Sequence, residues 1–172
     1  AKLRERLGRT IYGVDDDTLE AVVVDLLRRR GETLAVAESC TGGLLANRIT
    51  NVPGASVVFD RGVVTYSNQA KEELLDIPAA VIAAEGAVSA EVARLMAEGV
   101  RRRAGTDWGV GITGIAGPGG GSAEKPVGLV YYALVGPEVC LVREARWSGE
   151  RQAVKGRATQ AVLDLLRRTL LQ

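Results

Sequence analysis

The chain has 172 residues, with 47% apolar and 25% charged side chains, a composition typical of one globular domain with a hydrophobic core. Its formal net charge of +1 argues against direct binding to nucleic acid, which usually requires a strongly basic surface. The sequence has no histidine, so a Ser-His-Asp triad, a Cys-His dyad and a histidine-ligated metal site are all excluded.

Hydrophobic periodicity and turn residues predict helices that alternate with strands. We interpret residues 1–16 as a linker-like arm and residues 17–172 as a single domain. A capping box that starts at Asp17 begins the first helix, and Gly31 ends it. In chain order, the predicted elements are a helix at 17–30, a strand at 33–37, a helix at 41–50, a strand at 57–66 with an irregularity at Gly62, a short helix from Ser67, a helix at 89–103, a strand at 108–112, strands at 127–135 and 139–147, and a helix at 149–171.

This alternation predicts an α/β fold whose parallel sheet is covered by helices on both faces. Gly136-Pro137-Glu138 joins the last two strands into an antiparallel hairpin, so we expect a mixed sheet. Runs of arginine at 28–30, 101–103 and 167–168 lie near the ends of predicted helices, where cations complement the helix dipole. We therefore interpret them as solvated helix ends and not as a DNA-binding patch.

The segment Glu38-Ser39-Cys40-Thr41-Gly42-Gly43 lies where a predicted strand gives way to a helix. Ligands of open α/β sheets bind beyond the carboxyl ends of strands, and the start of a helix offers unpaired N–H groups to an anion. Ser39 is therefore placed to act as a nucleophile, with an oxyanion hole from Thr41, Gly42 and Gly43. On local spacing alone the alternative is favoured, in which Ser39 or Thr41 caps the helix.

Tyr66 and Lys71 form a second candidate cluster. Tyr66 ends a predicted strand and Lys71 lies about one turn into the next helix, so both can point at the same edge of the sheet. Lys71 could deprotonate Ser39 only if burial or a nearby dipole or cation lowered the pKa of its amine. The Tyr66 hydroxyl could steady that amine or relay its proton. Taken alone, an exposed lysine and a tyrosine at the edge of the core are the simpler interpretation.

Three further features of the sequence are candidates for ligand binding. Gly109, Gly111 and Gly114 match the dinucleotide-binding pattern G-x-G-x-x-G by letter, but they lie largely inside a predicted strand and no helix follows. The Gly/Pro-rich stretch 114–121 is better interpreted as a flexible ligand loop than as a plain surface loop. Arg151 begins the last predicted helix, where it could bind a phosphate, although solvation at the surface explains it equally well.

The two cysteines, Cys40 and Cys140, form neither a disulfide framework nor a zinc-binding spacing. Cys40 is a rival nucleophile, but along an extended segment it should point opposite to Ser39. No apolar run approaches the roughly 18 residues of a membrane-spanning helix, and no secretory signal is visible. We expect a cytoplasmic protein without membrane contact.

Several motifs occur in order along the chain: Ala37-Glu38-Ser39-Cys40-Thr41-Gly42-Gly43, Val64-Thr65-Tyr66-Ser67-Asn68-x-x-Lys71, Gly86-Ala87-Val88-Ser89, Thr113-Gly114-Ile115-Ala116-Gly117-Pro118 and Lys125-Pro126-Val127-Gly128. Together they resemble those of the CinA C-terminal domain, a family that includes nicotinamide mononucleotide deamidases. The resemblance runs from about Thr33 to the C-terminus, and residues 11–16 are similar to the segment that leads into this domain in longer relatives. We therefore expect a C-terminal piece of a protein whose N-terminal domain is molybdopterin-binding-like.

The resemblance implies a three-layer αβα sandwich with a mixed, mostly parallel sheet, and a homo-oligomer. It also implies a serine–lysine amidohydrolase in which Ser39 is the nucleophile, Lys71 the general base and Tyr66 the supporting hydroxyl. The implied reaction converts nicotinamide mononucleotide and water to nicotinic acid mononucleotide and ammonia, with no metal or other cofactor. We hypothesise that a loop holds the ribose and phosphate and that Arg151 clamps the phosphate; the loop residues are Thr113, Gly114, Ala116 and Gly117.

Two other classes of function stay open. A non-catalytic nucleotide-sensing module of competence or DNA-damage proteins would keep the glycine-rich ligand loop but would not need a lysine with a lowered pKa. An accessory role in protein–protein contact or DNA recombination is the third interpretation, and the near-zero net charge argues against its DNA-binding form.

Overall fold

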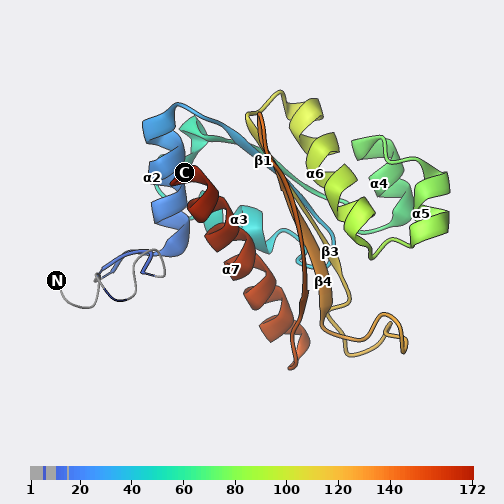
Figure 1. Ribbon diagram of the computed structural model, residues 1–172. Coiled ribbons are helices and arrows are strands. Elements are labelled where there is room, and N and C mark those ends of the chain that lie inside the picture. Colours follow the sequence, from blue (N-terminus) through green and yellow to red (C-terminus); the bar gives the residue numbers. More distant parts are fainter. Residues whose placement is uncertain (1–5, 7–10, 15) are drawn as a thin grey trace.

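The computed structural model describes residue 6, residues 11–14 and residues 16–172, so most of the predicted arm at 1–16 lies outside the described residues. A five-stranded sheet with the strand order β2-β1-β3-β4-β5 forms the centre of the molecule (Figure 1). The strands are β1 (Leu34–Glu38), β2 (Phe59–Val64), β3 (Trp108–Gly114), β4 (Leu129–Val135) and β5 (Cys140–Arg146).

Strand direction confirms the predicted mixed, mostly parallel sheet. β1 pairs in parallel with β2 on one side and with β3 on the other. β4 is antiparallel to both β3 and β5, so four of the five strands run in one direction and β4 alone is reversed. The carboxyl ends of β1, β2 and β3 therefore meet at one edge of the sheet.

Helices cover both faces of the sheet, which confirms the three-layer sandwich (Figure 1). On one face, α2, α3 and α7 bury side chains such as Val23, Leu45 and Val162 against the sheet. On the other face, α4, α5 and α6 pack Leu75 and Met96 among a second apolar cluster. The helices are α2 (Leu19–Arg30), α3 (Leu44–Thr50), α4 (Asn68–Leu75), α5 (Ala79–Glu85), α6 (Ala90–Ala104) and α7 (Arg151–Leu170), with a 3₁₀ turn η2 (Ala55–Val57).

The glycines of the apparent dinucleotide-binding pattern have a packing role. Gly109 and Gly111 lie inside β3, directly under α6. A Cβ atom at Gly109 would lie 2.2 Å from the carbonyl oxygen of Ala97, and one at Gly111 would lie 2.3 Å from that of Ala93. Both approaches are closer than van der Waals contact, so only glycine lets the helix pack this tightly on the strand.

Two details of the β2 and α5 regions differ from the sequence-based expectation. The predicted strand at 57–66 begins only at Phe59, and its register shifts near Asp60 and not at Gly62. Gly62 is instead a place of close approach, because its Cβ would lie 2.7 Å from the Cβ of Ala46 on α3. Helix α5 was not predicted at all, because it buries only Ile82 and so shows no helical periodicity.

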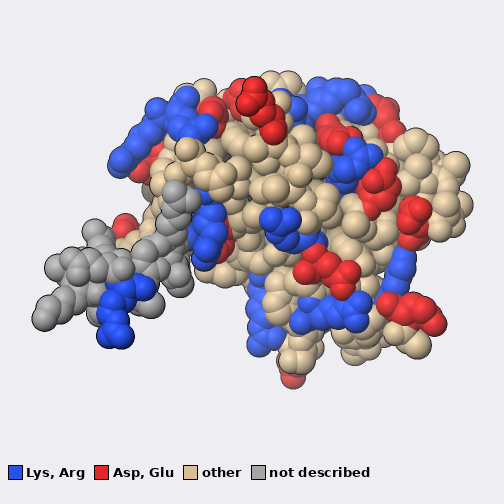
Figure 2. All heavy atoms as spheres, viewed as in Figure 1, with Lys and Arg blue, Asp and Glu red and all other residues tan. Residues whose placement is uncertain are grey.

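The helix ends show two further differences. Thr18, and not Asp17, caps α2, where its hydroxyl accepts a hydrogen bond from the N–H of Ala21 at 3.3 Å. The arginine runs do occupy the last turns of α2, α6 and α7, but Arg167 is buried and pairs with Asp164 at 2.6 Å. On the face seen in Figure 2, basic and acidic side chains are interspersed. In the part of the chain that the structure describes, no helix combines the length and apolarity needed to cross a membrane.

Candidate active site

The first two chemical motifs meet at the carboxyl edge of the parallel strands. Ser39 directly follows β1, and its N–H donates to the carbonyl oxygen of Ile112 on β3 at 2.9 Å. Thr65 directly follows β2, and its N–H donates to the carbonyl oxygen of Glu38 at 2.8 Å. These bonds extend the sheet by one residue on each strand, so Ser39 and Thr65 leave it from fixed positions.

Helix α4 brings Lys71 to Ser39. The Ser67 hydroxyl caps α4 by accepting from the N–H of Ala70 at 3.0 Å, which places Lys71 one turn into the helix. The Lys71 side chain is buried, with 1% of the residue exposed. Its Nζ lies 3.2 Å from Ser39 Oγ, 2.8 Å from the carbonyl oxygen of Thr65 and 3.5 Å from that of Ser67. The predicted pairing of Ser39 with Lys71 is therefore present in the geometry.

Burial shifts the pKa values of Lys71 and of the neighbouring Cys40. It lowers the pKa of Lys71, because a buried amine loses the hydration that stabilises its charged form. A negative charge on Cys40 would oppose this effect, but burial raises the pKa of the Cys40 thiol to about 12 and keeps it uncharged. Among the described residues Lys71 forms no ion pair and contacts only a hydroxyl and two carbonyls. The same burial argues against Cys40 as the nucleophile, because thiolate and not thiol is reactive.

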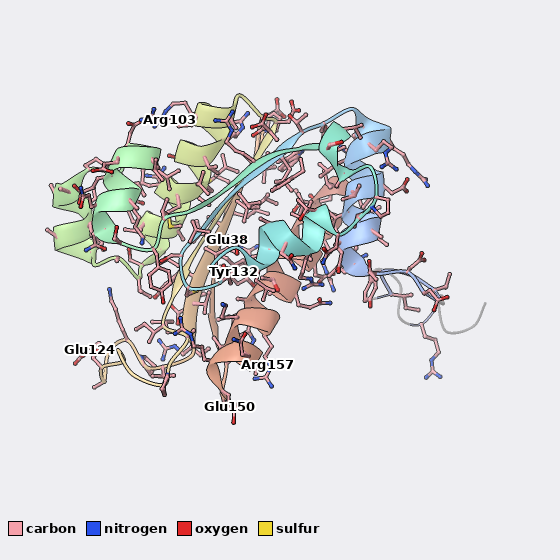
Figure 3. The ribbon with its side chains drawn as sticks, turned by 180° about the vertical axis from the view of Figure 1, so that it is seen from behind. Glu38, Arg103, Glu124, Tyr132, Glu150 and Arg157 are labelled. Carbon is pink, nitrogen blue, oxygen red and sulfur yellow. The ribbon has the colours of Figure 1, made fainter. Side chains whose placement is uncertain are left out.

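The turn after β1 is held by a residue to which the sequence assigned no role. The Glu38 side chain is buried and turns toward the start of α3, where Figure 3 labels it. Its carboxylate accepts from the N–H groups of Gly43 at 3.2 Å, Leu45 at 3.1 Å and Ala46 at 2.8 Å. The N–H of Gly42 donates to the Ser39 carbonyl at 3.1 Å. The Gly42 and Gly43 donors expected to form the oxyanion hole are thus already engaged.

Ser39 and Lys71 open onto a cavity of about 260 Å³. It includes most of the ligand-binding residues expected from the sequence, whereas Thr41, Gly42 and Gly43 lie outside it. Thr41 is fully buried, and its hydroxyl has no hydrogen-bond partner among the described residues. The lining residues come from the turns after β1 and β2, from α4, from the end of β3 and the loop after it, from the α5–α6 junction and from the start of α7: Ser39, Cys40, Tyr66, Lys71, Ala87, Val88, Thr113, Gly114, Ile115, Ala116, Gly117, Gly119, Gly120 and Arg151.

Tyr66 and Arg151 form the more exposed end of this cavity. Arg151 donates to the carbonyl oxygen of Gly117 at 2.8 Å and to the Tyr66 hydroxyl at 2.8 Å. Tyr66 is 59% exposed and is not among the hydrogen-bond partners of Lys71. The structure gives no hydrogen bond from Lys71 Nζ to the Tyr66 hydroxyl, which bonds to Arg151 instead. Thr113 is buried and donates to the carbonyl oxygen of Ala87 at 2.7 Å.

No group of three or more cysteine, aspartate or glutamate side chains among the described residues could hold a metal ion.

A second basic side chain, in addition to Arg151, lies near the turn that follows Ser39. Lys155, one turn after Arg151 on α7, places its Nζ 3.6 Å from the position that a Cβ on Gly42 would take.

Comparisons with known proteins point to one family. The model of the CinA C-terminal domain matches residues 16–170. The chain is 58% identical over 168 residues to a protein of Moorella thermoacetica named as competence-damage inducible, and 53% identical over 169 residues to a CinA-like protein of Geobacter sulfurreducens. Each alignment covers 98% of this chain but only 41% of the relative, so the chain spans about two fifths of the length of these relatives.

Solved structures agree with this result. The competence/damage inducible protein CihA of Agrobacterium tumefaciens has a TM-score of 0.88 at 38% identity, with 94% of this chain and 99% of that chain covered. A CinA superfamily protein of Klebsiella pneumoniae has a TM-score of 0.86 at 34% identity, with 89% of this chain and 96% of that chain covered. With its fold and its motifs both matched, the chain belongs to the CinA C-terminal domain family.

Proposed function

We propose that this domain hydrolyses the carboxamide of nicotinamide mononucleotide, giving nicotinic acid mononucleotide and ammonia. The observation that carries the proposal is the buried Lys71 Nζ at 3.2 Å from Ser39 Oγ, at the edge of a ligand-sized cavity. A lysine amine is buried without an acidic partner only at a cost in free energy. Such an arrangement is typical of a functional group kept uncharged for proton transfer.

The partners of Lys71 suit a neutral amine. A neutral amine has two N–H bonds and one lone pair, and the carbonyl oxygens of Thr65 and Ser67 can only accept hydrogen bonds. When both N–H bonds point to these carbonyls, the lone pair is left for the hydroxyl of Ser39. The Ser39 hydroxyl can then donate its proton to Lys71, as a general base requires.

We propose the following reaction at this site. The proton of Ser39 moves to Lys71 Nζ while Oγ bonds to the carboxamide carbon, and the carbonyl electron pair moves onto oxygen. The adduct collapses, the carbon–nitrogen bond breaks, and Lys71 returns the proton to the departing ammonia. A water molecule then loses a proton to Lys71, attacks the acyl ester and releases the carboxylic acid, which restores the Ser39 hydroxyl.

In this proposal the more exposed end of the cavity binds the phosphate of the substrate. We propose that Arg151 holds the phosphate, because a guanidinium presents paired donors to a phosphate and remains charged at all relevant pH values. Tyr66 and the Gly117 carbonyl fix the direction of that guanidinium by direct hydrogen bonds. The loop at 113–117 lies between the two ends, where we place the ribose. Gly114 and Gly117 let this loop pack closely on the chain around β4, because a Cβ atom would lie 2.7 Å from the Leu129 carbonyl oxygen at Gly114 and 2.6 Å from Val127 Cγ1 at Gly117.

An ammonia-release assay tests the proposal. Nicotinamide mononucleotide should give ammonia and nicotinic acid mononucleotide in equal amounts, in the presence or absence of a chelator. Free nicotinamide should react far more slowly, because it lacks the phosphate that Arg151 binds. A nucleotide-sensing module would bind the same mononucleotide in calorimetry and release no ammonia, and that result would reject the hydrolase.

Some wider properties belong to the same proposal. The length of the relatives supports a longer protein in which this domain is joined to another, which we propose is molybdopterin-binding-like. We also propose a cytoplasmic homo-oligomer. Light scattering on the purified chain would test the oligomeric state, and a monomer at micromolar concentration would contradict it.

A further inference from the structure

The start of α3 lacks a cap of its own. Gly43 stands at the N-cap position with a φ of +90° and has no side chain with which to accept a hydrogen bond. The first N–H groups of a helix have no partner within the helix, and leaving them buried and unpaired costs free energy. Glu38, which precedes the turn, acts as the cap: its two carboxylate oxygens accept hydrogen bonds from three N–H groups of the turn and helix.

This capping leaves a specific pair of donors free. From Gly42 to Ala46 every backbone N–H has a partner: those of Gly42 and Leu44 bond to carbonyls within the turn, and the other three bond to Glu38. Among the described residues, the N–H groups of Cys40 and Thr41 donate to no other residue, and that of Cys40 is near only its own thiol sulfur. Both residues are buried, and buried N–H groups without a partner are rare in folded proteins.

We infer that Glu38 is a positioning residue that reserves the N–H groups of Cys40 and Thr41 for the oxyanion of the Ser39 reaction. The inference rests on the proposed function, in which Ser39 attacks a carbonyl. As the bond from Oγ to carbon forms, the carbonyl electron pair becomes an oxygen anion beside the nucleophile. The N–H of the residue that directly follows a nucleophilic serine is a usual donor to that oxygen, and here that residue, Cys40, lines the cavity beside Ser39. Glu38 touches neither the substrate nor Ser39 Oγ and acts through the turn.

Nuclear magnetic resonance on the unaltered chain tests the donor assignment. A fluorophosphonate provides the probe: Ser39 Oγ bonds to phosphorus, fluoride leaves, and the hydroxyl proton is released through Lys71. The phosphoryl oxygen then stands where the oxyanion would form. We expect the amide protons of Cys40 and Thr41 to move downfield and to become protected from exchange. A larger response at Gly42 or Gly43, or none at Cys40 and Thr41, would overturn the assignment.

A Glu38→Gln substitution tests the positioning role. An amide has one acceptor oxygen where the carboxylate has two, and its NH₂ group faces an N–H donor, so the turn should shift. A displacement of about 1 Å at a reacting group can lower the rate about 100-fold, and we expect such a fall in kcat and in the rate of fluorophosphonate labelling. KM should change far less, because Arg151 and the cavity are untouched.

Arg48→Ala is the matched control on the same helix. Arg48 ties α3 to α2 and α7 through Glu20, Thr159 and Gln160, far from the N-terminal donors. It should lower the melting temperature while the labelling rate at Ser39 is kept. A folded Glu38→Gln protein that labels at the wild-type rate would reject the role of Glu38. Failure of the wild-type chain to release ammonia, with labelling intact, would reject the substrate and leave the role of Glu38 standing.

Discussion

The two ends of the cavity differ in their exposure to solvent, and in the proposed function the buried end carries out the chemistry while the exposed end binds the substrate. At the Ser39 end, Lys71 is 1% exposed and meets only neutral groups, so burial works against its charge. At the other end, Tyr66 is 59% exposed and accepts a hydrogen bond from Arg151. In the proposed function, a lysine that accepts a proton has to be uncharged, whereas a charged guanidinium attracts the phosphate anion. The fold meets both requirements of the proposal by burying the Lys71 amine more deeply than its partner site at the exposed end.

Substitutions at the buried end should act on kcat by the largest factors. Ser39→Ala removes the atom that bonds to the substrate carbon, and we expect kcat for ammonia release to fall by roughly 10⁵- to 10⁶-fold. The mononucleotide should still bind, because the exposed end is unchanged. Calorimetric titration beside the ammonia assay checks both parts. Substantial turnover by this variant would remove Ser39 from the mechanism.

The Lys71→Met variant tests whether Lys71 acts in catalysis or only in the structure of the fold. Methionine has similar length and no charge, so the variant keeps the packing of α4 while it removes the base. We expect kcat to fall by about 10³- to 10⁴-fold, the upper range for a general base. The melting temperature should stay the same or rise, because a buried amine without an acidic partner destabilises a fold. A marked loss of stability with retained kcat would mean that Lys71 serves structure.

Substitutions at the exposed end should change mainly KM, whereas those at the buried end change mainly kcat. Arg151→Ala should raise KM for the mononucleotide about 10- to 100-fold, the value of hydrogen bonds to a charged group. The same variant should lose most of its preference for the mononucleotide over the riboside that lacks a phosphate. Comparing kcat/KM for the two substrates in both proteins measures this. An unchanged preference would place the phosphate elsewhere, and Lys155 would be the next cation to substitute.

Tyr66→Phe should have the smallest effect and tests where Tyr66 acts. The structure ties its hydroxyl to Arg151, so its loss should raise KM by a few fold, the cost of about one hydrogen bond. The sequence had suggested a role beside Lys71, and a proton relay there would make kcat collapse instead. Steady-state kinetics of this single variant distinguishes the two positions.

The sequence predicted most of the fold and the reactive pair for identifiable reasons. Strands and amphipathic helices carry their periodicity in neighbouring residues. Parallel strands β1 and β2 end at the same edge of the sheet, where Ser39 follows β1 and the helix after β2 carries Lys71. Helix α5 was missed because a helix that buries only Ile82 shows no amphipathic pattern. The cap of α2 was placed one residue early because Asp17 and Thr18 are both good capping residues.

The parts of the site that the sequence did not predict depend on contacts whose spacing along the chain matches no short motif. Glu38 bonds to N–H groups five, seven and eight residues ahead, across a turn whose shape is set by glycines with positive φ. No helix-capping motif has that spacing, so the sequence alone indicated no separate role for Glu38. Tyr66 and Arg151 are 85 residues apart and meet only because α7 begins at the edge where β2 ends. Spacing along the chain could not have paired them.

Titration of Lys71 by nuclear magnetic resonance tests most directly whether its amine is uncharged. The Cε signal of Lys71, assigned by comparison with Lys71→Met, reports the charge on Nζ as pH is raised. Because burial lowers this pKa, the signal should titrate below the range of the exposed lysines, and kcat/KM should rise with pH through the same midpoint as the neutral base accumulates. A Lys71 signal that titrates with the exposed lysines, while kcat/KM stays flat through that range, would contradict proton transfer from Ser39 to Lys71.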